Sequence, residues 1–366
     1  MKFLPILLAA LALPAAATDY YLIKDETTVA DYCSLDGRGS DNSNFSGWAT
    51  TPTGTTKVQY SNSYGAKDPT GVYHINGHII RGKPSSMDSY AFEGGELVFD
   101  GTNPAINDKM NNSSTLTIGN LRVVSGTHGE IRNGDNGYTK TLAGENWVIE
   151  AGGMFGLNMG DENKNKRSFI CTATISGGGI LAATAGIGST TSTGGSVTLS
   201  GDLSNFTGVL SAGEKGATYT GTHAAAVANR SLVIGAASAL PASTPDGDVM
   251  LGSVCVTNGA TLSFTCDATS PDIRGWTFGS GAVPTVDVAS GKTVYVYGPV
   301  AGTVGFKKTG AGTLVLNVGG EGAYDTITLT GASTVFAATL SAYAARCEQW
   351  LEDRSGSATA GTIFFF

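Results

Sequence analysis

The stretch Lys307-Lys-Thr-Gly-Ala-Gly-Thr-Leu-Val-Leu316 is a glycine-punctuated turn that leads directly into a short apolar strand. Glycine permits the tight turn. The Thr-Leu-Val-Leu run that follows has the β-branched and apolar residues that are typical of a strand. Looser versions of this unit recur from about Leu97 onward, in the runs 95–99, 114–118, 146–149, 195–199, 231–234, 260–264 and 292–296. The repetition predicts a chain built from stacked short strands.

The spacing of these runs favours a solenoid. Leu97 and Leu116 are 19 residues apart and Val294 and Leu314 are 20 apart, which suits one coil, while other intervals are longer and uneven. Uneven loops fit a parallel β-helix better than a propeller, and Asn-Gly hairpins are not evident between the apolar runs. We therefore expect an all-β protein with a parallel β-helix over residues 90–332; a β-sandwich is the alternative.

Composition limits the class of protein and of partner. Gly is 52 of 366 residues and charged residues are 14%, against roughly 25% in ordinary soluble domains. Hydrophobic content of 41% indicates a folded chain. The net charge of −8 offers no basic stripe for phosphate groups, so we do not expect a nucleic-acid partner.

Residues 1–17 have the pattern of a secretory signal peptide. Lys2 supplies the positive region, Phe3 to Leu13 the apolar core, and Ala15 to Ala17 the cleavage site. The mature chain is then expected to begin at Thr18 and to be secreted or held at the cell surface. No apolar run of about 20 residues follows, so we expect no transmembrane helix.

The two ends of the mature chain differ in residue pattern from the repeats. Residues 18–89 are irregular and are expected to form an N-terminal cap, with strands near 20–23 and 72–75. The oxygen-rich stretch 36–44 lacks the EF-hand spacing for calcium, so a solvated loop is the preferred interpretation.

Residues 333–354 have the spacing of an amphipathic helix. One apolar face would hold residues at i, i+4, i+7, i+11 and i+14, namely Phe336, Leu340, Tyr343, Cys347 and Trp350. Ser333 or Thr334 would cap its start, and the helix would pack over the last coil. Residues 355–366 read as a flexible tail with an apolar end.

The five cysteines are Cys33, Cys171, Cys255, Cys266 and Cys347. Cys255 and Cys266 lie in two strand-like runs on either side of a turn at Asn258-Gly259. They are the pair best placed for a disulfide, with two buried thiols as the alternative. No Cys/His spacing suggests zinc.

Several segments resemble a known family. Phe306-Lys-Lys-Thr-Gly-Ala-Gly-Thr-Leu-Val-Leu316 resembles the autotransporter-associated β-strand repeat, whose pattern is Lys-x-Gly-x-Gly-Thr-Leu-x-Leu. Gly201-Asp-Leu-Ser-Asn-Phe-Thr-Gly-Val-Leu210 is similar to another segment of that repeat, and 232–241 with 256–262 are similar to its inter-repeat connection.

This resemblance covers residues 195–318. It implies an extracellular, passenger-like, right-handed β-helix that is surface-displayed and often adhesive, with no catalytic residues. Two features depart from the family. Only 50 residues follow Leu316, too few for a C-terminal translocator barrel, and passengers tend to lack cysteine. A secreted or separately tethered protein fits these departures better.

Candidate chemistry is sparse. The best group is His74, His78, Arg81 and Asp88, with His128-Gly129-Glu130 elsewhere; polar residues around an Asn76-Gly77 turn are the preferred interpretation. The charge run 161–167 reads as a solvated loop, with a binding epitope as the alternative. We expect no catalytic residue, cofactor or metal.

Tyr295 and Tyr297 alternate with Val294 and Val296 and so point to one face of a strand. They could contact sugar rings, or they could be ordinary sheet-surface tyrosines that stabilise cross-strand neighbours.

Three functions are compatible with these features. The first is an exported bacterial solenoid with a structural, surface-display or adhesive role, whose partner is a polysaccharide or another surface protein. The second is a polysaccharide-active β-helix enzyme, a lyase or glycoside hydrolase, and the third is a non-catalytic carbohydrate-binding protein. Carboxylates clustered with basic groups in one groove would favour the enzyme; a groove lined by Ser, Thr and Asn would favour the first function; exposed coplanar aromatics would favour the third.

Overall fold

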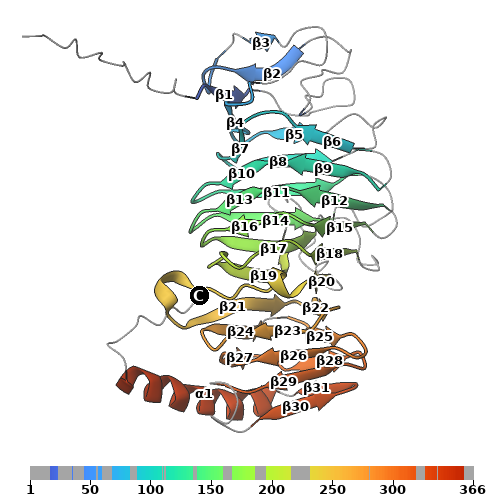
Figure 1. The fold of residues 1–366 in the computed structure, drawn as a ribbon, viewed down its shortest axis with the longest axis vertical. Helices are drawn as coiled ribbons and strands as arrows, with labels where there is room; N and C mark the ends of the chain where they lie inside the picture. The colour runs from blue at the N-terminus through green and yellow to red at the C-terminus, as the bar shows by residue number, and fades with distance from the viewer. Residues whose placement is uncertain are drawn as a thin grey trace, which may run out of the picture.

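The computed structural model describes residues 17–23, 35, 45–54, 57–59, 68–82, 89–108, 110, 113–134, 138–159, 167–185, 195–215, 231–279, 281–318, 326–335 and 337–357. They form a tall stack of strands with one helix at the C-terminal end (Figure 1). Residues 1–16 of the expected signal peptide, the 36–44 stretch, Cys33, Asp88, the charge run 161–166 and the tail from residue 358 lie outside the described residues.

From β4 to β29, successive strands lie on different faces of the stack, and most pair with the strand one coil further along the chain. Sheet A contains β1 Asp19–Leu22, β2 Phe45–Ala49, β3 Lys57–Gln59, β4 Val72–His74, β7 Glu96–Phe99, β10 Asn120–Val123, β13 Asn146–Ile149 and β16 Ile175–Ser176. Sheet B contains β5 Ile79–Arg81, β8 Ala105–Asp108, β11 His128–Asn133, β14 Met154–Asn158, β17 Ile180–Ala185, β19 Val209–Lys215, β21 Met250–Thr257, β24 Arg274–Gly279 and β27 Val300–Gly302.

The other two sheets complete the coils. Sheet C contains β6 Ser89–Phe92, β9 Thr115–Ile118, β12 Thr139–Ala143, β15 Ser168–Cys171, β18 Ser196–Leu199, β20 Ser231–Ile234, β22 Thr261–Phe264, β25 Thr285–Val288, β28 Phe306–Thr309 and β31 Ser333–Val335. Sheet D contains β23 Ala268–Ser270, β26 Thr293–Val296, β29 Thr313–Leu316 and β30 Ile327–Thr330. The helical elements are the 3₁₀ turns η1 Ala237–Ala239 and η2 Pro245–Gly247 and the helix α1 Ala337–Ser357.

The parallel pairing confirms the predicted β-solenoid and excludes the β-sandwich. Among the described strands, antiparallel pairs occur only at the two ends of the stack, between β1 and β2, β2 and β3, β28 and β31, and β29 and β30. A sandwich would need antiparallel neighbours throughout.

Glycines with positive φ mark the corner between sheets A and B. They occur at residues 77, 101, 126, 152 and 177, so successive corners are 24, 25, 26 and 25 residues apart. Leu97 accordingly pairs with Leu121 in the next coil. The expected 19-residue coil from Leu97 to Leu116 is wrong, because Leu116 lies on sheet C of the same coil; the 20-residue coil from Val294 to Leu314 is confirmed.

Aromatic side chains fill the interior of the stack. Phe155 contacts Phe99 and Trp147 edge to face, with ring centroids 5.2 and 5.8 Å apart. Nearer the C-terminus Trp276 stacks on Phe264 at 5.8 Å. All five are buried, and burial of each such side chain stabilises the fold by roughly 1.5–3 kcal/mol.

In the Lys-x-Gly-x-Gly stretch, the buried side chain of Lys308 holds the turn together. Its strand partner is the inward-facing Val286, and Lys308 itself is 1% exposed. Its Nζ donates hydrogen bonds to the carbonyl oxygens of Thr309 (2.7 Å), Gly310 (3.0 Å), Gly312 (2.8 Å) and Gly331 (3.1 Å). The ammonium group therefore provides hydrogen-bond donors for the carbonyl groups of the tight turn.

Both glycines of this turn are required by close approach to the preceding coil. Gly310 has φ +72°, and a Cβ there would lie 2.1 Å from the Val288 carbonyl oxygen. A Cβ at position 312 would lie 2.2 Å from the Ala289 oxygen. Side chains larger than hydrogen would push the coils apart at this corner.

The C-terminal end of the stack is covered on all three faces. β31 and β30 run antiparallel along β28 and β29, and α1 packs against β27 of sheet B. The Tyr343 hydroxyl accepts a hydrogen bond from the Val318 backbone N–H at 2.9 Å. These elements close sheet edges that would otherwise be open to pairing with another chain.

The predicted helix is confirmed, but it spans Ala337–Ser357 and so starts and ends later than expected, which makes residues 355–357 of the expected tail helical. Leu340, Tyr343, Cys347 and Trp350 are buried as expected. The helix begins at Ala337 because residues 333–335 pair with β28 instead, so Ser333 and Thr334 are strand residues and not caps.

At the N-terminal end the expected strands near 20–23 and 72–75 are present and pair in parallel. Because β4, β5 and β6 already make one coil, the stack extends into the region expected to be a cap. Among the residues described, no helix has the length and apolar character that crossing a membrane requires.

Candidate functional site

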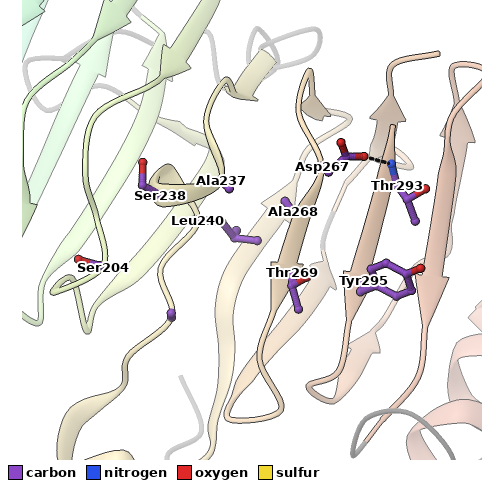
Figure 2. Close-up of a pocket in the computed structure, with 10 residues that line it drawn as sticks. Ser204, Ala237, Ser238, Leu240, Asp267, Ala268, Thr269, Thr293 and Tyr295 are labelled. Carbon is purple, nitrogen blue, oxygen red and sulfur yellow. Dashed lines mark hydrogen bonds between the residues drawn. The ribbon is translucent and has the colours of Figure 1, made fainter. Parts of the chain in front are cut away.

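A groove lies where one face of the solenoid is interrupted. Sheet A ends at β16, one further bridge joins Gly177 to Phe206, and the next coil carries η1 where the face would have a strand. Sheet D then continues the face from β23. The groove at this break has a volume of about 460 Å³ and is lined by Ser204, Ala237, Ser238, Leu240, Ala242, Asp267, Ala268, Thr269, Thr293 and Tyr295 (Figure 2).

Hydrogen bonds join the two loops that form one wall. The Leu203 N–H donates to the Ser238 carbonyl at 2.8 Å, and the Ser238 hydroxyl donates to the Gly201 carbonyl at 3.1 Å. The Ser243 hydroxyl donates to the Ser204 carbonyl at 2.9 Å. This wall is held by the backbone and by short side chains.

Arg274 of β24 is fully buried and contacts the loops of the groove wall. Its guanidinium donates to the carbonyl oxygens of Ser243 (2.9 Å), Gly208 (2.7 Å) and Ser253 (3.4 Å). Burial lowers the pKa of Arg274 to about 10, so the side chain stays protonated at neutral pH. One cation therefore ties both groove loops to β21.

The opposite wall carries one carboxylate and one aromatic ring. Asp267 accepts a hydrogen bond from the Thr293 N–H at 2.8 Å, and Lys292 Nζ lies 3.5 Å from its other oxygen. The Thr293 hydrogen bond and then the Lys292 charge lower the pKa of Asp267. Tyr295 is 39% exposed and pairs across the strands with Thr269. The arrangement can hydrogen-bond hydroxyl groups and stack on an apolar face.

Of the two predicted contact tyrosines, only Tyr295 lines the groove. The ring of Tyr297 lies beside it, with centroids 5.9 Å apart and planes tilted by 39°. The two rings are therefore not a coplanar platform.

The expected Cys255–Cys266 disulfide is not formed in this structure. The Asn258-Gly259 turn has positive φ at both residues and is a corner of the solenoid, which sends the chain from sheet B to sheet C. The two cysteines consequently lie on different faces. The Cys266 thiol donates to the Ile234 carbonyl at 3.6 Å, and burial with the adjacent Asp267 raises the pKa of Cys266.

The structure does not bring His74, His78 and Arg81 into one site. His74 lies on sheet A and Arg81 on sheet B, separated by the Asn76-Gly77 corner. His74 Nδ1 is 2.7 Å from Asp100 Oδ2 and Nε2 is 3.5 Å from Asp19 Oδ1. This histidine joins β1 to the first coils.

His74 should make stability depend on pH. Burial opposes its protonation, but the hydrogen bonds and charges of Asp100 and Asp19 outweigh burial and raise the pKa of His74. A raised pKa contributes stability that is complete below about pH 6.5 and is lost as pH rises through the folded-state value. We expect the melting temperature of the wild type to exceed that of His74→Gln most at pH ~5.5, with the gap closing by pH ~9. A gap that stays constant over this range would contradict the assignment.

Among the carboxylates of the groups predicted from the sequence, Glu130 is the one that lies in the described part of the chain. It lies on β11 with 0% exposure, 2.5 Å from Arg132 Nε, and it accepts a hydrogen bond from Asn158 Nδ2 at 3.0 Å. Both carboxylate oxygens therefore have cationic or amide partners. On sheet A, Arg122 similarly bridges Glu96 at 3.0 Å and Glu150 at 3.4 Å. Such pairs are typical of structural charge networks.

Sequence reasoning missed Asp267, Ser238 and Arg274. Asp267 and Ser238 carry no motif, and only the break between sheets A and D brings them together. Arg274 did give a signal, because it alternates with Trp276 and Phe278, which face the core. Within the described part of the chain, no cluster of three or more His, Cys, Asp or Glu residues could hold a metal ion.

The chain was compared with protein-family models, with curated proteins and with solved structures, and none matches. The fold therefore defines the class of protein, which is a parallel β-solenoid with a covered C-terminal end.

Proposed function

We propose that this protein is an exported bacterial β-solenoid with a structural and adhesive role at the cell surface, and that it is not an enzyme. The observation that carries the proposal is the groove beside Tyr295, which is lined mainly by hydroxyl-bearing and small side chains with a single carboxylate. General acid–base catalysis needs a proton donor and acceptor placed on the same substrate. A groove with a largely apolar surface and several hydroxyl groups along it is suited to holding a polysaccharide.

The state of Asp267 supports a binding role. Its lowered pKa keeps it ionised at neutral pH, where it accepts hydrogen bonds and cannot donate a proton. The nearest cation, Lys292, lies 3.5 Å away and forms an exposed ion pair with it. An ionised carboxylate of this kind positions hydroxyl groups.

Export and surface location rest on the sequence. The leader-like residues 1–17 and the low content of charged residues support them. The resemblance to the autotransporter-associated repeat supports surface display. Lys308 occupies the lysine position of that repeat, and its hydrogen bond to the Gly312 carbonyl gives a structural reason for a lysine there.

A polysaccharide-active enzyme is the second candidate, and Glu130 is the observation that favours it. A fully buried carboxylate beside an arginine is one way in which a catalytic group is held. The hydrogen bonds to both of its oxygens argue for a structural role instead.

The test is a panel of neutral and acidic polysaccharides, each incubated with the purified mature chain with and without calcium. We expect at least one neutral polysaccharide to be retained, with no release of reducing ends or unsaturated products. Release of either product would replace the adhesive proposal with the enzyme and direct mutagenesis to Glu130 and Arg132. If no polysaccharide is retained, the adhesive role toward glycans is wrong.

A further inference from the structure

We propose that the Tyr295 groove is a subsite for a neutral glycan, in which one sugar ring stacks on Tyr295 while Asp267 accepts hydrogen bonds from the sugar hydroxyls. This inference rests on the proposed adhesive function and names the ligand class and the residues that bind it.

The ring of Tyr295 is placed where a sugar ring could stack on it. Tyr295 leaves β26 on the outward face, is 39% exposed, and lies beside Thr269 of β23 (Figure 2). Sugar rings present C–H groups on their faces, and an aromatic ring with one exposed face offers them a complementary apolar surface. Thr269 adds a hydroxyl next to that surface.

The second step is the hydrogen-bonding capacity of the carboxylate. Asp267 uses one oxygen for the Thr293 N–H, and its side chain is 64% exposed. A carboxylate has about four lone-pair positions, so it retains capacity for hydroxyl donors. Hydrogen bonds to an ionised acceptor are stronger than those between neutral groups.

The third step is the charge of the groove. Among the described residues that line it, Asp267 alone carries a charge, and that charge is negative. Lys292 Nζ lies 3.5 Å from this carboxylate and balances its charge, so the groove offers no excess positive charge to an acidic polymer such as a polyuronate. The ligand is therefore expected to be neutral.

The groove also has a length and a rigid loop wall that suit an oligosaccharide. Ser204, Ser238, Thr269 and Tyr295 belong to four successive coils, which at roughly 4.8 Å between neighbouring strands gives a lining about 14 Å long. Arg274 and the serine hydrogen bonds fix the loop wall before any ligand arrives. A prearranged site of this length suits a short oligosaccharide segment.

The experiment measures binding of neutral hexasaccharides of glucose and mannose, and of hexagalacturonate, by isothermal titration calorimetry on the full mature chain. The variants are Tyr295→Ala and Asp267→Asn. The matched control is Tyr138→Ala, because Tyr138 is also 39% exposed and precedes β12 of sheet C, away from the groove. Melting curves of each variant establish that it is folded.

We expect Tyr295→Ala to weaken binding of the neutral hexasaccharide about tenfold, which corresponds to about 1.4 kcal/mol. Asp267→Asn should weaken it several-fold, and Tyr138→Ala should leave it unchanged. Binding that survives Tyr295→Ala, or a preference for hexagalacturonate, would overturn the subsite while leaving polysaccharide adhesion in place. Absence of wild-type binding to all of the oligosaccharides, neutral and acidic, would overturn both.

Discussion

Replacing Lys308 with methionine is expected to lower the free energy of unfolding by about 3 kcal/mol, because buried carbonyl groups lose a charged hydrogen-bond donor. The Lys308 ammonium group donates to four carbonyl oxygens at the last parallel turn, including that of Gly331 at the corner between β30 and β31. Methionine keeps much of the aliphatic length but offers no donor. Urea denaturation followed by circular dichroism measures the change.

The neighbouring lysine provides the control. Lys307 lies on the same strand with its side chain exposed, so Lys307→Met should change stability by less than about 0.5 kcal/mol. Equal effects of the two substitutions would show that the lysine of the Lys-x-Gly-x-Gly motif does not hold the turn.

Arg274→Met is expected to lower the free energy of unfolding by about 3–5 kcal/mol, which is similar to or larger than the change for Lys308. The reason is that a buried hydrogen-bond network is left without its central cation. The carbonyls of Gly208, Ser243 and Ser253 would lose their donor, and both loops of the groove wall would lose their tie to β21. We expect the variant to melt at a lower temperature and to bind the neutral hexasaccharide more weakly.

Arg122→Met is the matched control for Arg274. Arg122 is partly exposed and pairs with Glu96 and Glu150 on the surface of sheet A. Exposed ion pairs contribute about 0–1 kcal/mol to stability, so Arg122→Met should lower the free energy of unfolding only slightly. If Arg274→Met were as mild as Arg122→Met, Arg274 would not organise the groove.

Much of the fold follows from the sequence because the outward–inward alternation is clear on sheets A, C and D. Runs such as 116–118, 262–264 and 314–316 place apolar residues at every second position and are strands as expected. Sheet B is harder to recognise. Its strands include His128-Gly-Glu-Ile-Arg-Asn133 and Met154-Phe-Gly-Leu-Asn158, in which glycine and buried polar residues break the apolar pattern.

Missing one of three strands in a coil explains the error in coil length. With sheet B unseen, the interval from Leu97 to Leu116 looked like a full turn, although it joins two faces of one coil. The disulfide prediction failed for a related reason. An Asn-Gly turn with two positive φ values fits a hairpin and a solenoid corner equally well, and only the three-dimensional pairing distinguishes them.

The groove was predictable only in part. Alternation placed Tyr295 on an outer face, which is where it lies. The other lining residues come from four coils and from a face whose strand is replaced by η1. Because local sequence does not encode which loops of successive coils meet, Asp267, Ser238 and Arg274 could be assigned only from the structure.

The most direct test of the account is the chain length of a neutral polysaccharide that the protein retains, measured by size-exclusion chromatography after prolonged incubation with the purified mature chain. A binding scaffold predicts that the polysaccharide co-elutes with the protein and that its length distribution is unchanged. Progressive shortening of the retained polysaccharide would contradict the central claim and identify the protein as an enzyme.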